Sequence, residues 1–288
     1  MSNNQQNIRD LREKTGAGMM DCKRALDESN GDIDTAIEWL RKKGINTAEK
    51  KSSRDASDGL VTVITKNDSG IILEINSETD FVARNESFQD FCNQISNLCL
   101  EKKISSIDAL MNSKFNNEFD VKELLTNIVA KLGENIVIKR LNFLSDPNSK
   151  YSSYVHNQVN PSSGKIGVLL SYKCSEVNEE VEQLAKNLSM HAAATNPLSI
   201  DTTDLDINLV NKEKAIYIEQ LKDSGKPDDI IEKIVIGKLN KFYEEVCLLQ
   251  QFFVMENKIK VNKYIEDFNK SKSTDFQINN FLIFKLGQ

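Results

Sequence analysis

Residues 1–54 contain three stretches in which apolar residues recur at helical spacing. The glycine-containing segments 15–18 and 30–31 separate the stretches, Asp32 is a suitable N-cap for the third, and Gly44 is a suitable residue to end it. Three helices of this size bury little apolar surface, so we expect a small bundle that needs a partner or a neighbour. The apolar positions are Ile8 and Leu11 in the first stretch, Met19, Cys22 and Leu26 in the second, and Ile33, Ala36, Ile37 and Leu40 in the third.

The apolar spacing changes to that of β-strands after a segment without periodicity. Residues 46–58 are polar and predict a linker with some helical character. Two β-rich runs follow, and the polar segment 67–70 between them predicts a hairpin. Two amphipathic helices then precede a further strand, and Gly133 closes the second helix. The predicted strands span 60–65, 71–75 and 135–144, and the predicted helices span 88–98 and 121–132.

The order of strand and helix recurs in the second half of the chain. Ser163-Gly164 leads into a strand at 166–170 and a helix at 177–192, much as Ser69-Gly70 leads into a strand and a helix. The repeat is weak at the level of single residues, but it predicts two related α+β halves. Residues 276–286 form a last β-rich run.

Residues 207–249 differ from both halves. Two helical stretches flank the turn at 224–227, and the second carries an apolar stripe from Ile231 to Leu249. This pattern predicts an antiparallel helical hairpin that projects from the second half. The predicted fold is therefore α+β with antiparallel sheets. Its predicted domains are a helical domain and linker at 1–55, a first core half at 56–145, and a second core half at 146–288 that contains the hairpin.

Composition excludes several classes of protein. Charged residues make up 28% of the chain and prolines number 4, which excludes a low-complexity or collagen-like chain. No uninterrupted apolar run approaches the length of a membrane-spanning helix, and the polar residues 1–6 are not a secretory signal. The net charge of −6 disfavours a protein that binds nucleic acid through its phosphates. The 5 cysteines form no C-x-x-C motif, so we expect mostly buried thiols in a reducing cytoplasm rather than disulfides or a zinc site.

The sequence contains no complete set of catalytic residues. His156 and His191 are the 2 histidines of the chain, and none of the common phosphate-binding, zinc-protease or nucleophile motifs occurs. Glu78 and Asp80 form a conceivable acid/base pair, but no nucleophile or metal-ligand set accompanies them. A packed, hydrogen-bonded role is favoured for His191, and the basic run 41–43 is interpreted as a solvated helix end that complements the helix dipole. We therefore expect no catalytic residues, no cofactor and no metal.

Two apolar features are not explained by packing within the predicted elements alone. Met19 and Met20 are adjacent at a helix start and point in different directions, so at least one is expected to be exposed. Phe81 lies within the polar segment 77–85. From the residues alone we favour packing of Phe81 on its own domain, and contact with a partner stays open. Both features are candidate interaction sites.

Several longer motifs point to a family. The longest is residues 11–26 (LREKTGAGMMDCKRAL), and the second is residues 79–84 (TDFVAR), preceded by 70–74 (GIILE). With these motifs, the sequence closely resembles the bacterial elongation factor Ts family, the guanine-nucleotide exchange factors of elongation factor Tu. Further matching segments occur in family order over nearly the whole chain, at 130–135, 165–169, 190–193, 224–227 and 253–255.

The resemblance implies details of the fold and a set of partner contacts. It implies an N-terminal ubiquitin-associated-like three-helix domain, a core of two related α+β halves, and an inserted coiled-coil hairpin. Matching the motifs residue by residue gives the expected contacts with elongation factor Tu. These are Arg12, Met19, Met20 and Lys23 in the N-terminal domain, Thr79, Asp80, Phe81, Val82, Leu132 and Gly133 in the first core half, and His156, Val254 and Met255 in the second.

The chain departs from the family pattern at three places. The family usually has isoleucine where Leu132 stands, and the loop 157–163 after His156 is longer than in shorter family members. Relatives commonly continue into a terminal helix that adds a partner contact, whereas this sequence ends at Gln288, so that contact is not carried over.

The function implied by the resemblance is exchange rather than catalysis. The expected protein binds elongation factor Tu with GDP and promotes GDP release by disturbing the phosphate and Mg²⁺ site. Two alternatives stay open, a passive or chaperone-like partner of the same GTPase and an enzyme built on Glu78, Asp80 and a histidine. We expect a cytoplasmic protein that binds neither nucleic acid nor membrane directly, and the sequence leaves homodimerisation open.

Overall fold

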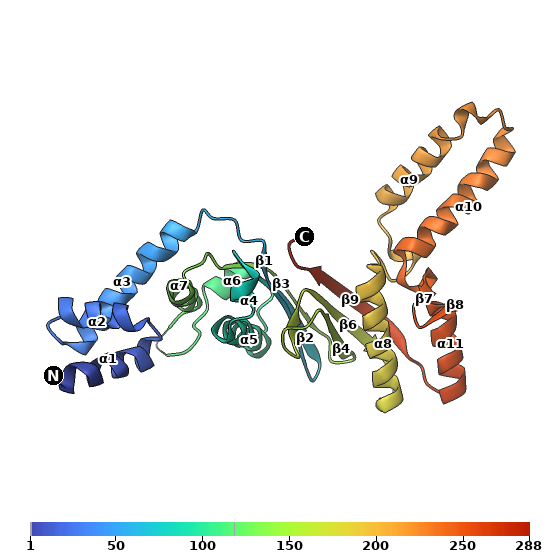
Figure 1. Cartoon of the computed structure of the whole chain (residues 1–288). Helices are drawn as coiled ribbons and strands as arrows, with labels where there is room; N and C mark the ends of the chain where they lie inside the picture. Colours follow the sequence, from blue (N-terminus) through green and yellow to red (C-terminus); the bar gives the residue numbers. More distant parts are fainter. Residues whose placement is uncertain (1, 118) are drawn as a thin grey trace.

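Antiparallel sheets form the centre of the molecule in the computed structural model, which describes residues 2–117 and 119–288 (Figure 1). One sheet has the strand order β3-β2-β1-β5 and the other the order β4-β6-β9. With helices on their outer sides, these sheets confirm the predicted α+β class. The first sheet contains β1 (Asp58–Lys66), β2 (Ser69–Ser77), β3 (Val137–Ser145) and β5 (Ser163–Gly164), and the second contains β4 (Lys150–His156), β6 (Ile166–Lys173) and β9 (Gln277–Lys285).

The two sheets pack face to face, which explains the nearly continuous apolar run of β2. Side chains alternate between the faces of a strand, so Ile72 joins the cluster between the sheets while Leu73 joins the cluster under the helices. The sheets approach closely at Gly167, where an added Cβ would lie 2.5 Å from Val63 Cγ2. At Gly70 an added Cβ would lie 2.5 Å from Leu169 Cδ1. A glycine on each sheet therefore allows this close approach without a shift of the facing side chain.

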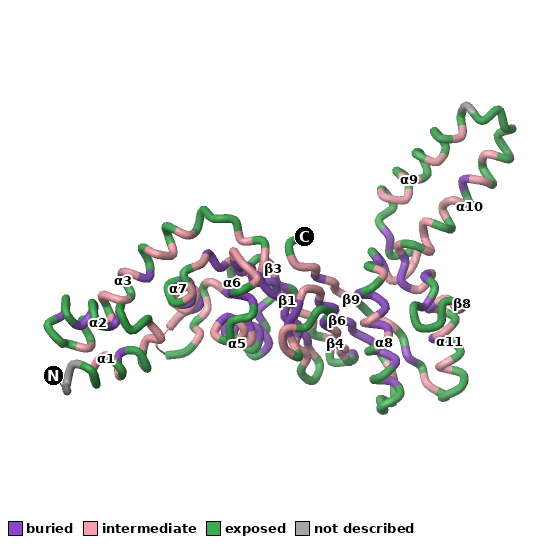
Figure 2. Tube along the Cα trace, in the orientation of Figure 1, coloured by how far each residue is buried: buried purple, intermediate pink, exposed green. Residues whose placement is uncertain are grey.

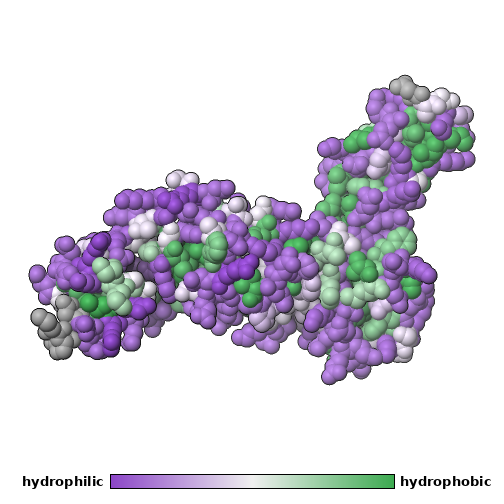
Figure 3. Space-filling view, in the orientation of Figure 1, coloured by the Kyte–Doolittle hydropathy of each residue, from purple (hydrophilic) through white to green (hydrophobic). Residues whose placement is uncertain are grey.

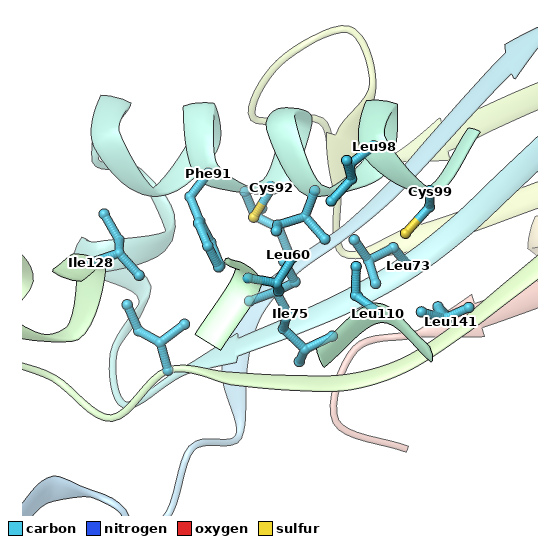
Figure 4. Packing of buried hydrophobic residues seen from close by; sticks show 14 of the residues in the cluster. Leu60, Leu73, Ile75, Phe91, Cys92, Leu98, Cys99, Leu110, Ile128 and Leu141 are labelled. Carbon is cyan, nitrogen blue, oxygen red and sulfur yellow. The ribbon is translucent and has the colours of Figure 1, made fainter. Parts of the chain in front are cut away.

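Helices cover the outer face of each sheet. Helix α5 (Glu86–Lys102) packs on β1 and β2, and α8 (Glu179–Thr195) packs on β4 and β6. Figure 4 shows Phe91, Cys92 and Leu98 of α5 above Leu60 and Leu73 of the first sheet. These contacts confirm the predicted helices after each strand run. The other helices of this layer are α6 (Ile107–Met111) and α7 (Val121–Leu132) in the first half and α11 (Val261–Lys272) in the second. The sequence pattern predicted α7 but neither α6 nor α11.

Buried groups also hold the two halves together. The Glu74 carboxylate on β2 is fully buried and accepts hydrogen bonds from Arg140 Nε at 2.7 Å and from the backbone N–H of Gly287 at 3.0 Å. Arg140 Nη2 also donates to the carbonyl oxygen of Lys285 at 2.9 Å. Since Arg140 lies on β3 of the first sheet and Lys285 ends β9 of the second, these bonds fix how the halves sit relative to each other.

The N-terminal helices α1 (Ser2–Thr15), α2 (Met19–Glu28) and α3 (Ile33–Lys51) form the bundle that the pattern predicted. The Asp32 side chain accepts from the Thr35 N–H, as expected of an N-cap. The predicted stop at Gly44 is wrong, because α3 continues seven residues further, to Lys51. Gly44 is buried where α3 crosses α7, and an added Cβ would lie 3.5 Å from Ala130 Cβ.

This longer helix also corrects the interpretation of the basic run 41–43. The run lies in the middle of α3 rather than at its end. Arg41 forms an ion pair with Glu123 of α7, and Lys43 forms one with Asp21 of α2. Arg41 therefore helps to attach the bundle to the core, and Lys43 helps to hold α2 and α3 together within the bundle.

A helical hairpin of α9 (Ile207–Glu219) and α10 (Asp228–Val246) projects from the second half (Figure 1). Figure 2 shows that it is largely exposed, whereas buried residues concentrate on the sheets, α5 and α8. Helix α10 ends at Val246, so Leu249, the last residue of the predicted stripe, lies outside this helix, in a short 3-10 helix at Leu248–Gln250. The chain then forms the small hairpin of β7 (Phe252–Phe253) and β8 (Glu256–Lys260).

Most of the thiols are buried, as predicted. All five cysteines are free, and Cys22, Cys92, Cys99 and Cys247 are buried, whereas Cys174 is partly exposed. Burial raises the pKa of Cys99 to about 12, so its thiol stays protonated near neutral pH.

Candidate functional site

Phe81 is the most prominent apolar side chain on the surface of the first half. Its side chain is 81% exposed, so the prediction that it packs on its own domain is wrong. It lies on α4 (Asp80–Ala83), a four-residue helix that follows β2, and its neighbours Val82 and Ala83 are buried in the core beneath α5. We call residues 79–83 the knob loop. The buried neighbours attach the loop to the core while Phe81 faces outward.

Polar bonds attach the start of the knob loop to the segment after α7. Thr79 donates its backbone N–H to Glu134 Oε2 at 3.0 Å and its hydroxyl to Glu134 Oε1 at 2.6 Å. In the reverse direction, the N–H of Asn135 donates to Glu78 Oε1 at 2.7 Å. That N–H, with a smaller contribution from Arg54, lowers the pKa of Glu78.

These bonds decide between the alternatives for the carboxylates. Glu78 is engaged by Asn135 and Arg54, and Asp80 lies 3.6 Å from Arg84 in an ion pair one helical turn apart. The histidines lie on the second sheet and on α8, which Figure 1 shows on the far side of the sheets from α4. No acid/base site that combines these carboxylates with a histidine is assembled among residues 2–117 and 119–288.

The same bonds bring two of the predicted contact segments together. Leu132 is the last residue of α7 and is half-buried, and Gly133 is exposed with a left-handed backbone (φ 73°) that ends the helix. Glu134 follows directly and binds Thr79. The structure therefore places residues 132–133 beside the knob loop.

The predicted contacts of the N-terminal bundle form a separate exposed surface. Met19 and Met20 are 60% and 63% exposed at the start of α2, so both face outward rather than one. Arg12 and Lys23 are exposed on α1 and α2. Figure 1 shows these helices at one end of the molecule, away from α4. A cleft of about 1040 Å³ lies between the bundle and α7, but none of the predicted contact residues lines it.

The contacts predicted in the second half lie at two places. His156 is exposed at the end of β4, where its Nδ1 lies 3.2 Å from the Tyr154 hydroxyl. Val254 and Met255 are each 45% exposed in the turn between β7 and β8. The Val254 N–H donates to Nδ1 of His191 at 3.3 Å, so a buried histidine holds this turn.

His191 has the packed, hydrogen-bonded role that the sequence favoured. It is fully buried on α8, and its Nε2 lies 2.9 Å from Gln251 Oε1. Because Nδ1 accepts from Val254, the ring proton resides on Nε2 and is donated to Gln251. Burial lowers the pKa of His191, which keeps the ring neutral near pH 7.

Within residues 2–117 and 119–288, no three or more His, Cys, Asp or Glu side chains gather in a way that would hold a metal ion. No helix in the same ranges combines the length and the apolar character needed to cross a membrane.

Comparison with known proteins identifies the family. The family model described as "Elongation factor TS" matches residues 78–288. The chain belongs to the elongation factor Ts family. Proteins named "Elongation factor Ts" from Rickettsia felis, Bartonella bacilliformis and Rhodospirillum centenum are 44%, 42% and 41% identical to it over 282 residues. Each alignment covers 98% of this chain and 91% or 92% of the relative.

Membership of the elongation factor Ts family confirms the resemblance and makes the chain a translation elongation factor, a protein of protein biosynthesis. The matched range begins at Glu78, one residue before the knob loop. It also contains residues 132–133, His156 and the turn with Val254 and Met255. The exposed N-terminal residues that were predicted to be contacts lie outside the match to the family model but within the alignments to the relatives, which cover nearly the whole chain.

Sequence reasoning missed the residues that hold the exposed contacts in place. Glu134, Asn135 and Gln251 were not singled out, although the first two belong to the family motif at 130–135. The available signal was the polar run Gly133-Glu134-Asn135 directly after an amphipathic helix. The role of this run depends on the contact between Glu134 and Thr79, which lies 55 residues earlier in the sequence.

Proposed function

We propose that this chain binds elongation factor Tu in its GDP-bound form and promotes release of GDP, so that GTP can bind. The observation that carries the proposal is the knob loop, in which an aromatic side chain that is 81% exposed sits on a short helix with two buried neighbours. Aromatic residues, phenylalanine among them, are enriched in protein–protein interfaces relative to the rest of the surface. Membership of the elongation factor Ts family supports this partner.

The proposed mechanism needs no chemical active site in this chain. A GTPase holds GDP through backbone N–H groups around the phosphates and through Mg²⁺, the largest local charge. A protein that binds a conformation with this site disturbed weakens nucleotide binding, and by linkage nucleotide weakens its own binding by the same factor. We propose that Phe81 inserts between elements of the partner that support the site, and that Asp80 positions the loop by charge-assisted hydrogen bonds.

The other contacts are proposed to make the interface broad. Residues 132–133 extend the surface of the knob loop, and His156 with the turn at 254–255 is proposed to reach another part of the partner. The exposed methionines of α2 offer flexible apolar contacts, and Arg12 and Lys23 flank them with positive charge. We propose Arg12, Met19, Met20, Lys23, Thr79, Asp80, Phe81, Leu132, Gly133, His156, Val254 and Met255 as the contact set, and Val82, which is buried, as a residue that supports the knob loop from the core.

The finer description of the fold is part of the same proposal. Residues 1–55 form a ubiquitin-associated-like domain with a linker, supported by the small apolar cluster that α1, α2 and α3 share. Residues 56–145 and 146–288 are the two related core halves. The hairpin at about 207–249 is a coiled coil, supported by the contacts of α9 with α10. The proposed place of action is the cytoplasm, where elongation factor Tu works.

Release of a fluorescent GDP analogue from elongation factor Tu, measured by stopped flow, tests the proposal. Increasing concentrations of the chain are expected to raise the release rate toward a maximum. Binding without faster release would instead indicate a passive partner. Deletion of residues 1–54 is expected to weaken association while circular dichroism shows a folded core. Unchanged affinity of that variant would remove the N-terminal surface from the contact set.

A further inference from the structure

Helix α4 of the knob loop has no side-chain N-cap, although a threonine stands at its N-cap position. Thr79 occupies the N-cap position of α4, where a threonine hydroxyl usually accepts from a backbone N–H of the first helical turn. Here the hydroxyl makes no such bond and is donated to Glu134 instead. A helix of four residues has no stability of its own, because helix nucleation is unfavourable. The conformation of α4 therefore depends on contacts from outside the loop.

Two carboxylates supply these contacts in a reciprocal arrangement. Glu134 accepts both the N–H and the hydroxyl of Thr79, and Glu78 accepts the N–H of Asn135. Each carboxylate thus binds the backbone of the residue next to the other carboxylate. We call this arrangement the Glu78–Glu134 clamp. Its bonds join an ionised acceptor to N–H or O–H donors in partly buried surroundings, which makes them stronger than bonds between neutral groups.

A third segment meets at the same point. The side-chain amide of Asn135 donates to the carbonyl oxygen of Arg54 at 2.7 Å, and Arg54 Nη1 lies 3.3 Å from Glu78 Oε2. Arg54 belongs to the connection between α3 and β1, so the clamp also holds the start of the core. The knob loop, the segment after α7 and this connection are therefore fixed relative to one another.

We propose that Glu134 and Glu78 are positioning residues that hold Phe81 in the orientation needed for contact with the partner, an inference that rests on the proposed exchange function. Neither carboxylate needs to touch the partner for this role. Val82 and Ala83 keep the end of the loop in the core without the clamp, but Asp80 and Phe81 then sample several orientations. Ordering them on binding lowers the affinity in proportion to the fraction of molecules in the competent orientation.

The first test compares Glu134→Gln with a matched control. Glutamine has the same shape but replaces one acceptor oxygen of the clamp with an amide, so only one of the two Thr79 donors keeps an acceptor. If the competent fraction falls to roughly a tenth, the concentration of the chain that gives half-maximal GDP release rises about tenfold. The control is Glu101→Gln, an exposed carboxylate on α5 with no hydrogen-bond or ion-pair partner in the described ranges. It is expected to behave as the unmodified chain.

A double-mutant cycle separates positioning from general stabilisation. If Glu134 acts through the aromatic ring, Glu134→Gln has no further effect on GDP release in the Phe81→Ala background. A purely structural role would lower release by the same factor in both backgrounds, and that result would overturn the inference.

Amide hydrogen exchange of residues 79–83 gives a readout that does not depend on GDP release. Glu134→Gln is expected to speed exchange there while the strands of the first sheet keep their protection, and unchanged exchange would overturn the inference. If the unmodified chain does not stimulate GDP release, the proposed function fails, and this measurement still decides whether the clamp holds the loop. Should Glu134→Gln not fold, Glu78→Gln is subjected to the same two readouts with the same expected directions.

Discussion

Replacement of Phe81 by alanine separates a role in contact from a role in the core. The side chain lies on a helix whose next two residues are buried, so its removal leaves the attachment of the loop intact. We expect Phe81→Ala to slow stimulated GDP release strongly and to change the stability of the chain little.

The size of each effect follows from exposure. A buried phenylalanine covers roughly 200 Å², and at 81% exposure only about 40 Å² is covered here, which corresponds to about 1 kcal/mol at about 25 cal/mol per Å². Alanine has a better helix propensity than phenylalanine, which offsets about 0.5 kcal/mol of this loss of stability. A fully buried residue such as Phe88 is expected to lose about 3–5 kcal/mol on the same change. Loss of an interface hot spot costs about 2 kcal/mol or more, which is about a 30-fold change in affinity.

The assay combines urea unfolding with the concentration dependence of GDP release from elongation factor Tu. Ile236→Ala is a matched control, because Ile236 is a 52% exposed apolar residue on the projecting helix α10 and outside the contact set. Figure 3 shows apolar residues of this hairpin at the surface among polar ones. A loss of about 3 kcal/mol of stability in Phe81→Ala would place the ring in the core and refute the reasoning. An equal loss of GDP release in Ile236→Ala would show that the contact is not specific to the knob loop.

Four further changes test other parts of the structure. Gly167→Ala is expected to lower the free energy of unfolding in urea by about 1–3 kcal/mol, because its Cβ would lie 2.5 Å from Val63 Cγ2 between the sheets; wild-type stability would mean that the sheets have room to spare. Gly44→Ala is expected to raise the melting temperature, since its Cβ makes ordinary contacts and alanine favours a helix over glycine by about 1 kcal/mol. A lower melting temperature would show that α3 and α7 approach too closely at this point to admit a methyl group. Burial lowers the folded-state pKa of His191, so the unfolded chain binds the proton first as the pH falls. The free energy of unfolding is therefore expected to fall as the pH drops from 6.5 toward the folded-state pKa. His191→Gln is expected to make this fall shallower, and an unchanged pH dependence would contradict a buried, neutral His191. Limited proteolysis is expected to cut first between α9 and α10. A chain with a shortened hairpin is expected to keep its effect on GDP release, whereas unfolding of that chain would show that these helices are part of the core.

Local sequence was sufficient for the elements whose ends depend on their own residues. Asp32 and Gly133 are examples, because a side-chain cap and a left-handed glycine act within one helical turn. Strands β1 and β2 and helices α5 and α7 were predicted for the same reason, since alternation and helical spacing reflect the faces that each element buries. Long family motifs, rather than single-residue chemistry, indicated the partner and the contact residues.

Contacts between distant residues decided what the pattern could not. Glycine is a residue type that often ends helices, so the sequence predicted a helix end at Gly44. Helix α3 nevertheless continues through Gly44, because packing on α7 outweighs the low helix propensity of glycine. Phenylalanine is a residue type that is usually buried, yet Phe81 is exposed, because only the next two residues, Val82 and Ala83, face the cluster under α5.

The same distinction applies to the site. The sequence by itself determined the order of the elements and the residues that carry the family motifs, since both depend on residues that are close together in the sequence. The tertiary structure alone decided that Glu134 binds Thr79 and that His191 holds the Val254 turn, across 55 and 63 residues of chain. Such pairings form when the whole chain buries its apolar faces together, and no local periodicity encodes which polar groups then become neighbours.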